Sequence, residues 1–121
     1  MKTLGPIMAL LLCSALLWTP LAAQESNVFV AGIEDLPLMG GLIEDGDAGL
    51  VFDKPEGRIV EAYATGEVTA SAVRAFYTAT LAQLGWQASD DGAYQRDDES
   101  LRIVISGVDG ALTVQFSLSP N

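Results

Sequence analysis

Histidine is absent from this sequence of 121 residues, and cysteine occurs once, as Cys13. Without histidine the chain cannot build a Ser-His-Asp or Cys-His nucleophile or use a histidine as general base. Because Cys13 lies in an N-terminal apolar run, the rest of the chain also lacks the ligands of common zinc, haem and iron–sulfur sites. We therefore predict no catalytic residues and no cofactor, and we expect a protein that is not an enzyme.

Basic residues are also scarce. Six Lys and Arg stand against 16 Asp and Glu, which gives a formal net charge of −10. If Lys2 is removed with the N-terminal segment, five basic residues remain and the net charge becomes −11. Such a chain repels phosphate backbones and anionic lipid surfaces. The charge argues against nucleic acid and leaves basic proteins, divalent cations or neutral ligands, although solubility alone also explains it.

The first 23 residues have the pattern of a secretory signal peptide. A positive start at Lys2 precedes the apolar run Leu4–Trp18, and Pro20 is followed by Leu21 and by two alanines up to Ala23. The run is about 15 residues long, shorter than the roughly 20 that a membrane-spanning helix needs. We predict cleavage after Ala23 and no stable membrane insertion afterwards. An uncleaved N-terminal anchor is the alternative.

The chain from residue 24 onward contains no cysteine. Cys13 follows Leu12, whereas a lipoprotein signal needs a small residue before its cysteine, so lipid attachment is not expected. Small secreted eukaryotic domains usually carry disulfides, and their absence favours a bacterial periplasmic protein held together by packing. We predict three parts: a signal peptide at 1–23, an irregular N-terminal arm at 24–49 and a folded domain at 50–121.

A helix is predicted to begin near Thr69, the expected N-cap, with Ser71 as the alternative. Apolar residues then recur at helical spacing and form one face, which consists of Val73, Phe76, Tyr77, Thr80, Leu81 and Leu84. Gly85 stands where a left-handed residue commonly ends a helix. Trp86 is then expected to pack back against the last turn.

Two interpretations of the aromatic residues in this stretch are open. Phe76, Tyr77 and Trp86 could form an exposed platform for a ligand. Aromatic residues at helical spacing are more often part of the core. We predict core positions for Phe76, Leu81 and Trp86.

Strands are predicted on both sides of the helix. Residues 50–53 and 57–66 precede it, short runs flank a hairpin at Asp91-Gly92, and two longer runs close the chain. In 112–119 apolar and polar residues alternate without a break, which predicts one buried face and one face exposed to solvent. The prediction is a single α+β domain, an antiparallel sheet in the order β-β-α-β-β-β-β with one long helix packed on one face.

Residues 24–49 contain apolar side chains without a regular period. Pro37 and the pair Gly40-Gly41 argue against a regular element there. We predict an ordered arm, and loops on a rigid scaffold often carry function. The candidate interaction surface consists of Leu36, Pro37, Leu38, Met39 and Leu42. The alternative is that these side chains are buried against the sheet or the helix.

Acidic turns suggest calcium as a second ligand class. Glu44, Asp45 and Asp47 surround Gly46, and residues 97–99 form a second acidic cluster. Hard oxygen ligands suit Ca²⁺, but the spacing matches an EF-hand loop only in part. Paired carboxylates could also perform glycoside hydrolysis, but nothing in the pattern singles out a pair. No metal ligands are therefore assigned.

Four blocks of the sequence resemble a family of small bacterial envelope proteins with no assigned activity. They lie at 35–42, 57–66, 76–86 and 112–120, and the helix carries a V-x-x-F-Y pattern that ends in L-G-W. The resemblance covers nearly all of the chain after the signal peptide and implies a strand, this helix and a meander. Ala82 and Gly40 stand where the family commonly has proline. The resemblance implies no catalytic residue.

These observations lead to a prediction of function by elimination. We expect a non-catalytic periplasmic accessory module that binds an envelope protein through a sheet edge or the N-terminal arm. A small-ligand or Ca²⁺-binding domain is the alternative. Neither the partner nor the oligomeric state follows from the sequence.

Overall fold

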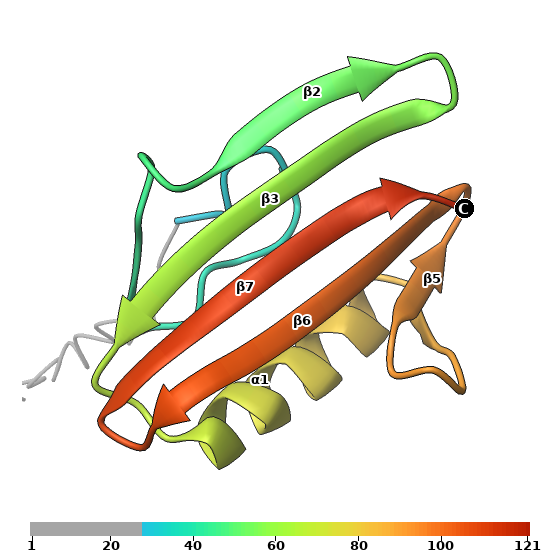
Figure 1. Cartoon of the computed structure of the whole chain (residues 1–121). Coiled ribbons are helices and arrows are strands. Elements are labelled where there is room, and N and C mark those ends of the chain that lie inside the picture. The colour runs from blue at the N-terminus through green and yellow to red at the C-terminus, as the bar shows by residue number, and fades with distance from the viewer. Residues whose placement is uncertain (1–27) are drawn as a thin grey trace, which may run out of the picture.

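The fold of this chain, taken from a computed structural model, is described for residues 28–121. The predicted signal peptide, 1–23, lies outside the described residues. The described chain is mostly antiparallel β-sheet with a single helix (Figure 1). Its elements are β1 (Leu42–Glu44), β2 (Leu50–Lys54), β3 (Gly57–Gly66), α1 (Ala70–Gln83), β4 (Gln87–Ala88), β5 (Tyr94–Arg96), β6 (Glu99–Val108) and β7 (Ala111–Pro120).

Three ten-residue strands form the centre of the sheet. The order is β1-β3-β7-β6-β5-β4, and β2 also pairs with β3. β2 and β1 thus share one edge of β3, because β2 pairs with its first half and β1 with its last residues. The four strands after the helix form the predicted meander, each paired with the next.

The helix α1 has the ends that the sequence predicts. The Thr69 hydroxyl accepts a hydrogen bond from the Ala72 N–H at 3.2 Å, as an N-cap does. At the other end Gly85 has φ +87°, and the Trp86 N–H donates to the Leu81 carbonyl at 2.9 Å. This is the Schellman arrangement, which satisfies carbonyls that the helix end leaves free.

The core lies on one face of the sheet. Figure 1 shows α1 and the segment before β1 on the same side of the sheet, and both contribute buried side chains. The sheet contributes alternate residues of its central strands, among them Val60, Ala62, Val114, Phe116 and Leu118. The opposite face carries the polar series Thr113, Gln115 and Ser117, as the alternation predicts.

The arm is more regular than predicted. Residues 42–44 form β1 against the end of β3, and Phe29 makes an isolated bridge with Pro37. The sequence argument missed β1 because a three-residue strand has no period of its own. β1 exists because the last residues of β3 offer an unpaired edge, to which Gly41, at φ +94°, directs the chain.

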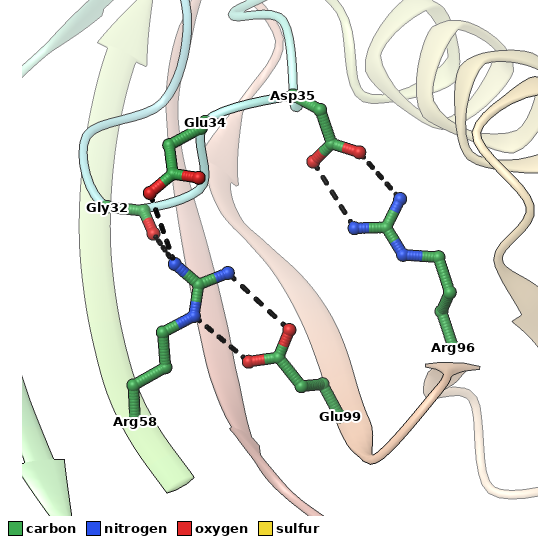
Figure 2. Close-up of polar contacts among 6 residues, drawn as sticks. All are labelled: Gly32, Glu34, Asp35, Arg58, Arg96 and Glu99. Atoms are coloured by element: carbon green, nitrogen blue, oxygen red, sulfur yellow. Dashed lines mark hydrogen bonds and ion pairs between the residues drawn. The ribbon is translucent and has the colours of Figure 1, made fainter.

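Two arginine networks tie the arm to the sheet (Figure 2). Arg58 donates to the Gly32 carbonyl at 2.7 Å and to the Glu99 carboxylate at 3.0 Å. Arg96 pairs with Asp35 at 2.6 Å and also donates to the Leu84 carbonyl. The hydrogen bond from Arg96 lowers the pKa of Asp35, because it favours the charged carboxylate.

Candidate functional site at an open strand edge

The predicted interaction surface in the arm is part of the core instead. Leu36 is fully buried, and Leu38 and Leu42 are 5% and 6% exposed. Pro37 and Met39 are half-buried, and Met39 packs against the core cluster. These five residues therefore form no exposed apolar patch in this fold. The physical reason is that α1 leaves part of the sheet face uncovered, and the arm fills that part.

Tyr77 fixes the arm to the helix. Its hydroxyl donates to the Pro37 carbonyl and accepts from the Met39 N–H, both at 3.0 Å. Its ring packs edge-on against Phe116 in the sheet, with centroids 5.3 Å apart. Burial raises the pKa of Tyr77 to about 12, because the charged phenolate is disfavoured there.

The aromatic residues of the helix motif do not form an open platform. Trp86 and Tyr77 are buried, and Phe76 is half-buried against the core. The guanidinium of Arg96 covers the Trp86 ring, 4.4 Å from its centroid. The core prediction is confirmed for Leu81 and Trp86, and for Phe76 in part.

The acidic turns make local contacts. Within residues 28–121 no group of three or more His, Cys, Asp or Glu side chains is placed to hold a metal ion. Asp45 accepts the Asp47 N–H in the turn after β1, and Glu44 accepts the Ala31 N–H. Glu99 is engaged by Arg58. Glu44, Asp45 and Glu99 thus have hydrogen-bonding or ion-pair partners within the described chain.

The structure shows an open strand edge that the sequence analysis did not locate. β6 pairs with β7 along its whole length, but on its other side β5 pairs only with Glu99, Ser100 and Leu101. Residues 102–108 therefore have no strand partner on that side among the described residues. Figure 1 shows that β5 lies beside only the first part of β6. An unpaired edge of this kind is a template for another strand.

The backbone groups at this edge follow from the strand register. Arg96 and Glu99 flank the two-residue turn between β5 and β6 and form a hydrogen-bonded pair, and such pairs recur at every second residue of an antiparallel ladder. Leu101, two residues after Glu99, therefore points its N–H and C=O toward Tyr94 of β5. Ile103 and Ile105 thus present their N–H and C=O groups outward, as Leu101 does toward β5. Gly107 has φ +92°, which distorts the strand and limits the regular edge to 102–106.

A groove runs beside the open edge, between β6 and α1. Its volume is about 410 Å³. The helix contributes Val73, Arg74, Tyr77 and Thr78, the β4–β5 hairpin contributes Gly92 and Tyr94, and β6 contributes Arg102, Ile103, Val104 and Ile105. The edge and the groove together offer backbone hydrogen-bonding groups next to a half-apolar surface.

A signal for this site was present in the sequence. The predicted strand after Asp91-Gly92 is much shorter than the strand that follows it. Where a short strand pairs with a long one, the remainder of the long strand is left without a neighbour. The position of α1 beside that remainder could not be read from the sequence.

A second apolar edge lies at β2, on the opposite side of the sheet. Leu50, Val51 and Phe52 are between 44% and 56% exposed. The strand ends in Asp53 and Lys54, and charged residues at an edge oppose strand addition. The pocket beside this edge is smaller, about 170 Å³, and is lined by strands and loops without α1, so we take β6 as the candidate site.

Comparison of the chain with models of protein families, with curated proteins and with solved structures found no match. The resemblance of the helix motif to the envelope family therefore remains a prediction. No helix in the described part of the chain is both long and apolar enough to cross a membrane.

Proposed function

We propose that this chain is a non-catalytic accessory domain of the bacterial periplasm, a single α+β unit that binds an extended polypeptide segment along β6. The observation that carries the proposal is the free edge of β6 at residues 102–106, next to a groove lined by α1. Export to the periplasm rests on the sequence pattern of residues 1–23.

Strand addition is a common way to bind an extended peptide. Main-chain hydrogen bonds to the edge supply affinity, and surfaces for alternate side chains supply specificity. The edge offers the outward backbone groups of Ile103 and Ile105. Side chains on the inner face of an added strand meet the accessible lining residues Arg74, Thr78 and Tyr94. Val104, 43% exposed, lies on the other face and adds apolar contact there.

A small neutral ligand is the second candidate. The groove volume of about 410 Å³ falls within the usual range of ligand pockets. Such a ligand would occupy the groove without forming hydrogen bonds along the strand. Strand addition therefore slows hydrogen exchange at the outward amides of β6, whereas a small ligand in the groove does not.

The test is amide hydrogen exchange with a synthetic extended peptide, acetyl-Thr-Val-Thr-Val-Gln-Val-Thr-amide. We expect slower exchange at Ile103 and Ile105, because an added strand bonds their outward N–H groups. Thr78→Trp fills the groove and should abolish this protection. Ala79→Trp is the matched control, since Ala79 is also exposed on α1 but does not line the groove.

The result that contradicts strand addition is equally specific. If the peptide leaves exchange at Ile103 and Ile105 unchanged in the unmodified protein, the edge does not bind it. If the protection stays intact in both Thr78→Trp and Ala79→Trp, the peptide binds outside the groove.

A further inference from the structure

The groove differs in charge from the rest of the molecule. Its lining contains two arginines, Arg74 and Arg102, and no acidic side chain. The chain as a whole carries 16 acidic and six basic residues. A cationic groove on an acidic protein attracts negative charge locally, while the surrounding surface repels it.

Of the four arginines in the described chain, three make ion pairs. Arg58 and Arg96 hold the arm through Glu99 and Asp35. Arg102 pairs with Asp91 at 3.3 Å and donates to the Asp91 carbonyl. Arg74 is exposed on α1 and makes no ion pair within residues 28–121.

The two groove arginines lie on different sides of the position that an added strand would take. Arg74 projects from the helix, which lies on the core side of the sheet. Arg102 is paired in register with Ser117, on the polar face. Of the two, Arg74 has no competing carboxylate, so it faces the inner side chains of an added strand with its charge uncompensated.

We propose that the β6 groove selects an extended segment that carries a carboxylate on its helix-facing side, and that Arg74 is the residue that selects it. The inference rests on the proposed strand addition at β6. Apolar side chains two positions before and two positions after the carboxylate lie on the same face and pack on the accessible lining residues Thr78, Ile103 and Ile105. The partner is thus an acidic, β-prone polypeptide segment, in spite of the acidic character of the protein.

The test compares three peptides that differ at one position, acetyl-Thr-Val-Thr-X-Thr-Val-Thr-amide with X as Glu, Gln or Lys, in which X and both Val lie on the same face of the strand. At low salt we expect the Glu peptide to bind at least about threefold more tightly than the Gln peptide. The Lys peptide should bind most weakly of the three. In Arg74→Gln the Glu and Gln peptides should bind equally. In Arg74→Glu the preference should reverse toward the Lys peptide.

Lys54→Glu is the matched control, because it makes the same change of charge at an exposed residue of β2, on the opposite edge of the sheet. It should leave the order of the three peptides unchanged. Equal binding of all three peptides to the unmodified protein overturns the role of Arg74 and leaves strand addition standing. Failure of all three to bind overturns the proposed function itself, and this inference with it.

Discussion

At the scale of single residues, Trp86 combines deep burial with an unpaired polar atom. The side chain is 4% exposed, and its Nε1 has no hydrogen-bond partner among the described residues. A buried N–H without a partner lowers stability, whereas the volume of the ring raises it. The two contributions can be separated by substitution.

We expect Trp86→Ala to lower the free energy of unfolding by about 3–5 kcal/mol, because it removes a large aromatic side chain from the core. Trp86→Phe should lower it by clearly less, since the unpaired N–H is removed together with part of the volume. Urea denaturation of both variants measures the difference. If Trp86→Phe and Trp86→Ala lower the free energy of unfolding equally, the volume of the ring does not explain the contribution of Trp86.

Tyr77 makes the stability sensitive to alkali. Its pKa is raised to about 12 in the folded chain, against about 10 in an unfolded one. A raised pKa favours the protonated form, so its stabilising contribution is complete below about pH 10 and is lost as the pH rises toward 12. We expect the thermal midpoint to fall across this range.

Tyr77→Phe is the matching variant. It leaves the Met39 N–H and the Pro37 carbonyl without their partner, which should cost about 1–3 kcal/mol at neutral pH. The part of the alkaline decline that belongs to Tyr77 should be absent in this variant. An identical decline in both proteins would assign it to other groups.

At the scale of elements, the arm depends on contacts distant in sequence. Arg96 joins three parts of the fold, since it pairs with Asp35, donates to the Leu84 carbonyl and covers the Trp86 ring. Five backbone hydrogen bonds within residues 28–42, among them the Val30 N–H to the Leu36 carbonyl, join the arm to itself and not to the sheet. Its attachment is therefore expected to loosen before the central strands do.

We expect Arg96→Ala to lower the free energy of unfolding by about 1–2 kcal/mol, a modest loss because Asp35 is 47% exposed and the ion pair is screened. Amide exchange at Val30 should become faster, while exchange in β7 should change little. Arg74→Ala is the control, since Arg74 makes no ion pair in the described chain and should leave Val30 unaffected. If both variants behave alike, Arg96 does not hold the arm.

At the scale of the whole molecule, the charge surplus opposes compaction. The formal net charge of −10 produces self-repulsion, which salt screens. We expect the thermal midpoint to rise with ionic strength, and CaCl₂ and NaCl at equal ionic strength to raise it equally. A larger rise with CaCl₂ would contradict this expectation and reveal a specific cation site by mass action.

Local patterns in the sequence determined a large part of this fold. The limits of the helix followed from Thr69 and from Gly85-Trp86, because capping depends on a few adjacent residues. The polar face of β7 followed from the strict alternation of apolar and polar residues, since the side-chain period of a strand is two. The absence of histidine excluded every chemistry that requires an imidazole, because composition alone decides which side chains a site can use.

Tertiary structure decided the two features that bear most directly on function. Leu36, Leu38 and Leu42 became core because α1 leaves part of the sheet face for the arm to cover, and the sequence does not show how wide a gap the helix leaves. The open edge of β6 arises because β5 is short and α1 lies beside the unpaired part. Both outcomes depend on where distant elements stop relative to one another, which no local pattern encodes.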